Sequence, residues 1–360
     1  MRRLLAGCLA LACGATPPVT DGFAVARPGY GFVFPRDHGS HPAFRTEWWY
    51  FTGHLWSGDG SRRFGYQLTF FRQASPPSAW KGSPAWRSDQ LHLAHAALTD
   101  EAGRRFLVDE RLDRAGLLAG AAEDRLAVFQ QDWHATQDPA GLIHLRMTLK
   151  GAALDLVLEP TTPLVIFGQD GLSRKGADPE AASHYLTFPR LRSRGSLRLP
   201  EGLTLTVNGT SWMDHEFSSS QLARDQVGWD WAGIQLRDGR SLMVYRLRRK
   251  DGSQDPFSML TEVDAAGHIR RSTQTFSLVP KASWRSPATG TAYPLPLVLD
   301  AWGELFTLVP ILLDQELQTG RSTGITYWEG ACRVLNPAGQ NIGDAYVELT
   351  GYAHSLKGRF

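Results

Sequence analysis

The sequence contains one unit twice, and this internal repeat limits the possible fold more than any other feature. An aromatic segment, a DG turn and a segment ending in arginine run from Trp49 to Arg72 and again from Trp229 to Arg248. Repeats of this kind indicate two copies of one structural unit. At a constant offset the copies share two aromatic residues and a glycine, Trp49, Phe51 and Gly53 in the first and Trp229, Trp231 and Gly233 in the second. We therefore expect the same aromatic face to build both copies.

Three further matches follow in the same order along the chain. DEAG from Asp100 matches DAAG from Asp264, LVLEP ending at Pro160 matches FTLVP ending at Pro310, and VNGT from Val207 matches ELTG from Glu348. Short alternating segments separated by DG and AG turns, with little helical periodicity, are typical of all-β proteins. A unit of roughly 150 residues suits an antiparallel barrel of about eight strands, which can enclose one apolar ligand. The sequence predicts two such barrels; the alternative is chance similarity among aromatic-rich strands.

The start of the chain is typical of a bacterial export leader. A basic start precedes the apolar run 4–12, which is followed by small residues and prolines. That run is too short to span a bilayer, and no later run approaches the required length. Cys13 resembles the lipid-modified cysteine of a lipoprotein leader, and simple cleavage near Ala15 is the alternative. We predict an exported protein, periplasmic or membrane-anchored by lipid, with a leader over 1–20 and barrels over 21–215 and 216–360.

The composition argues against several functions. The net charge is +2 and no basic block is interleaved with aromatic residues, so we expect no nucleic-acid partner. Cys332 is the one cysteine beyond the leader, which leaves no disulfide framework and no CxxC site. The sequence has no HExxH, GxSxG, GxGxxG or P-loop motif. We therefore expect no metal and no nucleotide, and the sequence does not indicate a protein partner.

Acids and tryptophans are concentrated in the segment 211–231. As a strand, WMDHEF places Trp212, Asp214 and Glu216 on one face and His215 on the other. Burying a carboxylate costs several kcal/mol unless it is paired or hydrogen-bonded, so this face either solves a structural problem or performs chemistry. GWDWAG belongs to the repeat, whereas the acids of WMDHEF do not. Asp214, His215 and Glu216 are therefore the predicted catalytic residues.

Acids also lie beside aromatic residues in EWWYFTGHL from Glu47, in DQEL from Asp314, in YWEG from Tyr327 and in YVELTGYA from Tyr346. The simpler interpretation of these clusters is structural: indoles and phenols fill a barrel, and the carboxylates accept hydrogen bonds from them.

Several of these strings together resemble the AttH-type family, which includes the bacterial carotenoid 1,2-hydratases. They are EWWYFTGHL, FGYQLTFFR, LAHAALTD, WMDHEF followed by GWDW, DQEL, YWEG and YVELTGY, over about residues 44–353. The resemblance implies an all-β fold of two lipocalin-like barrels. It also implies chemistry without a cofactor, because the hydratases of this family add water to an isolated carbon–carbon double bond of a carotenoid.

Such a reaction explains why acids and aromatic residues would occur together. Protonating an alkene needs a desolvated general acid, and the resulting carbocation is stabilised by the face of an aromatic ring. Asp214 is the first candidate for the proton donor, with His215 as its neighbour, and Glu216 or Asp230 would place the water. The predicted ligand-binding residues are Trp212, Trp229, Asp230, Trp231, Tyr245, Glu47 and Trp48.

Two other functions remain open. The hydratase pattern has an acid two residues after a tyrosine, whereas Tyr245 is followed at that place by Leu247. A non-catalytic barrel that binds an elongated apolar ligand, an isoprenoid or lipid, is therefore the second hypothesis. A secreted hydrolase that uses Asp214 and His215 is the third, although no nucleophile stands out.

Overall fold

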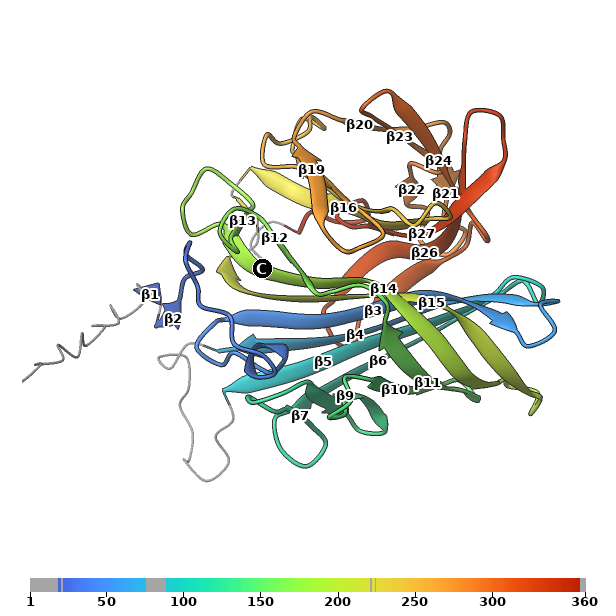
Figure 1. Ribbon diagram of the computed structural model, residues 1–360, viewed down its shortest axis with the longest axis horizontal. Coiled ribbons are helices and arrows are strands. Elements are labelled where there is room, and N and C mark those ends of the chain that lie inside the picture. The colour runs from blue at the N-terminus through green and yellow to red at the C-terminus, as the bar shows by residue number, and fades with distance from the viewer. Residues whose placement is uncertain (1–18, 21, 76–88, 221, 224, 357–360) are drawn as a thin grey trace, which may run out of the picture.

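The protein is built almost entirely of antiparallel β-strands (Figure 1). The computed structural model describes residues 19–20, 22–75, 89–220, 222–223 and 225–356, so Cys13 and nearly all of the predicted leader lie outside the described residues. Within the described ranges the helical structure is one 3-10 turn, η1 (Arg36–His38). No helix in this part of the chain is long and apolar enough to cross a membrane.

The first large sheet has thirteen strands, paired in the order β6-β5-β4-β3-β15-β14-β11-β10-β9-β8-β7, with β12 and β13 also on β14. Its strands are β3 (Thr46–Ser57), β4 (Arg63–Ala74), β5 (Gln90–Asp100), β6 (Arg105–Arg114), β7 (Ala119–Ala121), β8 (Ala127–Gln130), β9 (Trp133–Gln137), β10 (Ile143–Leu149), β11 (Ala152–Pro160), β12 (Val165–Phe167), β13 (Ser173–Arg174), β14 (Ala182–Arg198) and β15 (Thr204–Ser220).

The second large sheet has ten strands in the order β19-β18-β17-β16-β27-β26-β24-β23-β20, with β25 also on β26. Its strands are β16 (Gln226–Leu236), β17 (Ser241–Arg249), β18 (Met259–Val263), β19 (Ile269–Thr273), β20 (Ser277–Pro280), β23 (Leu297–Ala301), β24 (Glu304–Pro310), β25 (Glu316–Thr319), β26 (Ile325–Leu335) and β27 (Asn341–Leu349). Two short hairpins complete the fold, β1 (Val19–Thr20) with β2 (Phe23–Ala24) and β21 (Trp284–Arg285) with β22 (Ala292–Tyr293).

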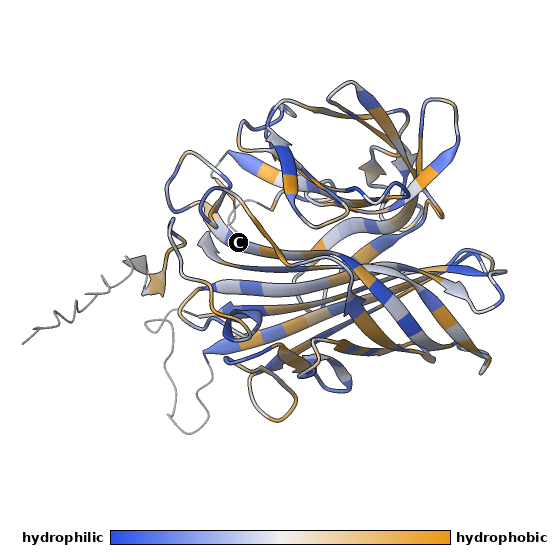
Figure 2. Ribbon diagram, viewed as in Figure 1, coloured by the Kyte–Doolittle hydropathy of each residue, from blue (hydrophilic) through white to orange (hydrophobic). Residues whose placement is uncertain are grey.

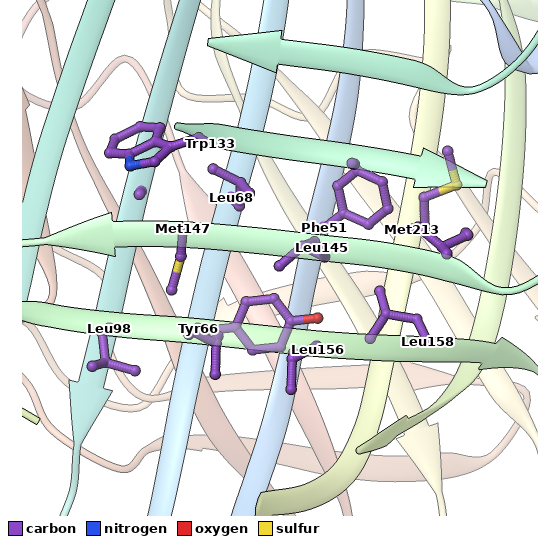
Figure 3. Packing of buried hydrophobic residues seen from close by; sticks show 14 of the residues in the cluster. Phe51, Tyr66, Leu68, Leu98, Trp133, Leu145, Met147, Leu156, Leu158 and Met213 are labelled. Atoms are coloured by element: carbon purple, nitrogen blue, oxygen red, sulfur yellow. The ribbon is translucent and has the colours of Figure 1, made fainter. Parts of the chain in front are cut away.

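Each large sheet curls around its own apolar core. Hydrophobic and hydrophilic residues alternate along many of the strands (Figure 2), so every second side chain points inward. In the first barrel these inward residues include Phe51, Leu68 and Trp133, packed as in Figure 3. In the second barrel they include Ile234 and Trp328. The two cores are separate, as expected for two barrel domains.

Side chains bridge the gap between the two end strands of the first sheet. No backbone ladder joins β6 to β7 among the described residues. Instead Arg111 of β6 donates to the Gln130 carbonyl of β8 at 2.7 Å, and the Gln130 amide donates to Asp113 at 2.7 Å. These bonds bring the sheet close to closure and leave little edge exposed for pairing with another chain.

The two barrels follow the same strand order, which confirms the internal repeat. Strands β3 to β6 correspond to β16 to β19, β15 and β14 correspond to β27 and β26, and β11 corresponds to β24. The DEAG and DAAG segments form the turns after β5 and β18. Pro160 and Pro310 end β11 and β24.

The prediction that Trp229 and Trp231 face the same way in β16 as Trp49 and Phe51 do in β3 is wrong, because the alignment of the two copies is shifted by one residue. Trp49 and Phe51 lie in the core of the first barrel, whereas Trp229 and Trp231 point out of the second barrel toward the first. Because side chains alternate between the two faces of a strand, a shift of one residue moves a whole set to the other face. Trp229 therefore occupies the kind of position that Tyr50 has in β3.

The boundary between the barrels also lies later than expected. Residues 215 and 216 fall inside β15, which pairs with β3 and β14 up to Ser218 and Ser220 respectively. The strands of the second barrel begin at Gln226. The expected boundary fell inside the acid-rich string WMDHEF, which carries no signal for where a long strand ends.

Candidate active site between the barrels

The two barrels pack with their central strands face to face, and a pocket with a cavity of about 110 Å³ lies between them. The first barrel contributes β3, β4, β5, β14 and β15, together with the segment after β13. The second contributes β16, β17, β26 and β27. The lining residues are Trp48, Tyr50, Thr69, Phe71, His95, Lys175, Tyr185, Asp214, Glu216, Trp229, Trp231, Tyr245, Leu247, Thr323, Ile325, Tyr327, Glu329, Glu348, Thr350 and Leu356.

Asp214 lies at the wall formed by β15 and is buried. Three donors hold its carboxylate: the hydroxyls of Tyr185 and Thr187, at 2.7 and 2.6 Å, and the indole N–H of Trp212, at 2.7 Å. Burial raises the pKa of Asp214 to about 7, although these hydrogen bonds act in the opposite direction. Asp214 is therefore able to accept or release a proton near neutral pH.

Glu216 projects from the same face of β15, as the alternation of WMDHEF predicts. Lys175 Nζ lies 3.0 Å from Glu216 Oε1, and the Ser183 hydroxyl donates to the same oxygen. Burial lowers the pKa of Lys175, but Glu216, Tyr245 and Asp214 together outweigh this effect and leave the pKa raised. The ammonium also lies 4.2 Å from the ring centre of Tyr245. Glu216 and Lys175 therefore form a buried ion pair.

Two further carboxyl groups face the pocket from the second barrel. Glu329 of β26 and Glu348 of β27 are directly opposite each other in the antiparallel ladder. Burial raises the pKa of Glu348 to about 7, and burial together with the charge of Glu348 raises the pKa of Glu329 well above its usual range. Two neighbouring buried carboxylates repel each other, so this pair retains a proton at neutral pH.

Aromatic side chains form much of the remaining wall. Trp229 donates its indole N–H to Glu348 Oε2 at 2.9 Å, and Trp231 donates to the Tyr185 hydroxyl at 3.0 Å. Trp231 also packs edge-on against Tyr50, with ring centres 5.2 Å apart. Together with Trp48, these aromatic rings line the same cavity as the carboxyl groups. The electron-rich faces of such rings attract positive charge.

Six of the ten predicted catalytic and ligand-binding residues line this pocket: Trp48, Asp214, Glu216, Trp229, Trp231 and Tyr245. Trp212 does not line it but donates its indole N–H to Asp214. Asp230 instead faces the inside of the second barrel, where Arg248 Nε and the Tyr352 hydroxyl each bond to it at 2.9 Å. Glu47 and His215 face the inside of the first barrel. The predictions that Asp230 and Glu47 bind ligand and that His215 is catalytic are therefore not supported by their positions.

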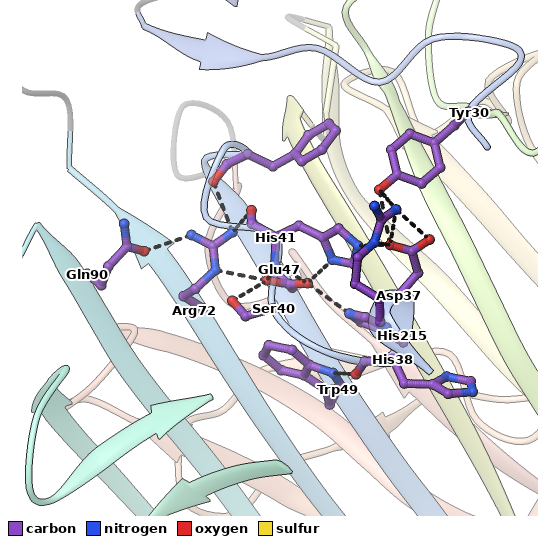
Figure 4. A network of polar contacts seen from close by, with 12 residues as sticks. Tyr30, Asp37, His38, Ser40, His41, Glu47, Trp49, Arg72, Gln90 and His215 are labelled. Carbon is purple, nitrogen blue, oxygen red and sulfur yellow. Dashed lines mark hydrogen bonds and ion pairs between the residues drawn. The ribbon is translucent and has the colours of Figure 1, made fainter. Parts of the chain in front are cut away.

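Glu47 and His215 belong to a polar network inside one end of the first barrel (Figure 4). Glu47 Oε1 lies 2.9 Å from His215 Nε2 and 2.7 Å from His41 Nδ1, while Glu47 Oε2 accepts from Arg72 and Ser40. Burial opposes ionisation of Glu47, but Arg72, His215 and His41 together lower its pKa well below the usual range. This network ties the segment before β3 to the barrel.

His41, Glu47 and His215 also bring three possible metal ligands within 4.8 Å of one another. The guanidinium of Arg72 already balances the Glu47 carboxylate at 2.9 Å. A divalent cation at this position would therefore leave excess positive charge in a buried site, which is unfavourable. We interpret the group as a structural network.

Sequence reasoning missed fourteen of the twenty lining residues, among them the polar residues Lys175, Tyr185, Tyr327, Glu329 and Glu348. The strings YWEG and YVELTGYA did indicate acids beside aromatic residues. Their pairing across β26 and β27 depends on register, which a single sequence does not show.

Known proteins share this fold. The family model described as AttH-like matches residues 25–352. The crystal structure of an AttH protein, NE1406, from Nitrosomonas europaea is 35% identical with a TM-score of 0.82, and the match covers 92% of this chain and 100% of that one. Kievitone hydratase from Nectria haematococca is 13% identical with a TM-score of 0.68, over 94% and 97%. None of the curated protein sequences matches this one. The chain belongs to the AttH-like family.

Proposed function

We propose that the protein is a cofactor-free hydro-lyase that adds water to an isolated carbon–carbon double bond, or removes it, in the pocket between the barrels. The observation that carries this proposal is the group of buried carboxyls among aromatic rings. A site that only held an apolar molecule would gain nothing from burying Asp214 and Glu329 and half-burying Glu348, because each acid removed from water is costly. The fold similarity to kievitone hydratase is consistent with the same reaction class.

The hydrogen bonds suggest different roles for the acids than the sequence did. All three bonds to Asp214 donate toward its carboxylate, so they favour the ionised form and a role as general base. Glu329 is the better proton donor, because burial and Glu348 keep it protonated. In this proposal Glu329 protonates the alkene, the faces of Trp229 and Trp231 stabilise the carbocation, and Asp214 takes a proton from the attacking water.

The size of the cavity restricts the substrate. A cavity of about 110 Å³ is smaller than the roughly 150 Å³ cavity that holds one benzene molecule. It therefore encloses a compact apolar group, such as one isoprene unit, rather than a whole elongated isoprenoid. An elongated substrate would place only its reacting end between the barrels.

The test is an assay of water addition to alkenes in water labelled with heavy oxygen. The panel contains molecules that end in a trisubstituted double bond, from a single isoprene unit to long isoprenoids, and mass spectrometry detects labelled alcohol. We expect wild-type protein to form labelled product. We expect Glu329→Gln and Asp214→Asn to lose at least about a hundredfold in rate, because each removes a proton-transfer group.

Asp230→Asn is the matched control, since Asp230 is an equally buried acid that faces away from the pocket. Its rate per folded molecule should stay within a few-fold of wild type. The proposal would be wrong if Glu329→Gln and Asp214→Asn both turned over normally. It would also be wrong if no alkene reacted while purified protein carried a tightly held lipid, which would favour a binding protein.

A further inference from the structure

A chain of hydrogen bonds leads from the pocket to the surface between the barrels. The Tyr327 hydroxyl, which lines the pocket, lies 2.8 Å from His95 Nδ1. His95 Nε2 lies 2.9 Å from Ser322 Oγ, and the Ser322 hydroxyl donates to Glu110 Oε2 at 2.5 Å. Glu110 also lines an open groove on the outside of the molecule, together with the largely exposed Arg321. Every link in the chain has hydrogen-bond length.

The donors and acceptors in this chain have one consistent arrangement. Burial opposes ionisation of Glu110, but the hydrogen bonds from Ser322 and Arg321 outweigh it and lower its pKa, so Glu110 is an acceptor. Ser322 therefore donates to Glu110 and must accept from His95 Nε2–H. Burial lowers the pKa of His95 to about 4, so the ring is neutral and its Nδ1 accepts the Tyr327 proton.

Glu329 continues the chain on the pocket side. Tyr327 and Glu329 project from the same face of β26, two residues apart. The nearby Tyr327 hydroxyl lowers the pKa of Glu329, against the larger effect of burial. Glu329 Oε1 is buried without a hydrogen-bond partner among the described residues, which leaves it available to the Tyr327 hydroxyl. Thus the proposed proton donor stands at the inner end of the path, and a carboxylate beside a solvent-filled groove stands at the outer end.

We propose that Tyr327, His95, Ser322 and Glu110 form a proton path that connects Glu329 to solvent. Four transfers move one proton outward: from Glu329 to the Tyr327 oxygen, from Tyr327 to His95 Nδ1, from His95 Nε2 to Ser322, and from Ser322 to Glu110. Each intermediate group gives up one proton and gains one, so only Glu329 and Glu110 change charge. Outward transfer leaves His95 protonated on Nδ1 and the Tyr327 hydroxyl donating to Glu329, and from this opposite arrangement the same bonds carry a proton inward to Glu329.

The need for such a path rests on the proposed function. Hydration as proposed leaves Glu329 ionised and Asp214 protonated, on opposite walls of a pocket that product still fills. A path through His95 restores the proton on Glu329 while the pocket is occupied. It is not a hydrolase triad, because the acid contacts the serine and the histidine contacts a tyrosine.

The test measures proton exchange in ligand-free protein. After rapid mixing into heavy water, time-resolved infrared spectroscopy follows the protonated carboxyl band of Glu329, assigned by its loss in Glu329→Gln. Ser322→Ala interrupts the path but keeps Glu110 bound to the backbone N–H groups of Arg321 and Ser322, at 3.1 and 2.8 Å. Ser322→Thr is the matched control, because it keeps the hydroxyl.

We expect Ser322→Ala to slow the exchange at least about tenfold, with Ser322→Thr within about twofold of wild type. Exchange in Ser322→Ala as fast as in wild type would overturn the proposal. So would equal slowing in both variants, which would show that the contact only holds the barrels together. Slowed exchange in Ser322→Ala without any alkene hydration by wild type would support the path and contradict the proposed function alone.

Discussion

At the scale of single residues, the pocket contains more acids than cations. Among its described lining residues are four carboxyls, from Asp214, Glu216, Glu329 and Glu348, and Lys175 is the one lysine or arginine. Lys175 pairs with Glu216. The other three carboxyls have no paired cation in the described part of the chain and are stabilised by hydrogen bonds or by staying protonated. A buried general acid must be protonated before it can donate a proton.

The ion pair of Lys175 with Glu216 gives a test of this charge balance. Lys175→Met leaves Glu216 buried without its cation, and we expect the free energy of unfolding to fall by about 3–5 kcal/mol. Lys175→Met combined with Glu216→Gln removes both charges and should recover most of the loss. Denaturant unfolding of the two variants measures this difference. Equal destabilisation in both would show that packing of the lysine, and not charge, is responsible.

At the scale of elements, the ladder between β26 and β27 places Glu329 opposite Glu348 and makes stability depend on pH. Burial raises the pKa of Glu348 to about 7, above its value in the unfolded chain. Between the unfolded pKa of about 4.3 and the folded value, the native state binds more protons, so this contribution to stability declines as pH rises. The contribution is complete below the unfolded pKa and lost above about 7.

Glu348→Gln removes this dependence. We expect the variant to lose less stability than wild type between about pH 5 and pH 8, as measured by denaturant unfolding at each pH. The quantity to compare is the difference in free energy of unfolding between wild type and Glu348→Gln at each pH. Groups such as Glu47, whose lowered pKa makes stability rise with pH, are present in both proteins and cancel in this difference. Parallel stability curves for wild type and Glu348→Gln would contradict the raised pKa of Glu348.

The strands also show which part of the fold the sequence could predict. The alternation of side chains in WMDHEF correctly places Asp214 and Glu216 on one face of the strand and His215 on the other. This prediction succeeds because alternation depends only on neighbouring residues.

The register of the repeat is not local. β16 turns Ala232 and Ile234 into the core of the second barrel, so Trp229 faces outward although the sequence aligns it with inward-facing Trp49. The DG turns are 179 residues apart, from Asp59 to Asp238, whereas the two tryptophans are 180 apart, and this difference of one residue exchanges the two faces.

At the scale of the whole molecule, the site exists only because two barrels face each other. The repeat and the aromatic strings were enough to predict two barrels, and they were enough to predict Asp214 and Glu216 on one wall. Lys175 belongs to the first barrel and Glu329 to the second, and only the packing of the barrels brings Glu329 to the cavity that Asp214 and Lys175 line. The sequence therefore could not distinguish Glu329, which faces the pocket, from Glu47, which faces a barrel interior.

The proposed hydration requires above all a protonated Glu329 carboxyl in this pocket at neutral pH. An infrared titration of ligand-free wild type and Glu329→Gln detects this proton through the carbonyl stretch of the protonated acid. We expect a band that persists above pH 7 in wild type and is absent in Glu329→Gln. If instead no carboxyl band remained above about pH 6, as for acids with ordinary pKa values, the pocket would hold no proton to deliver and the proposed mechanism would be wrong.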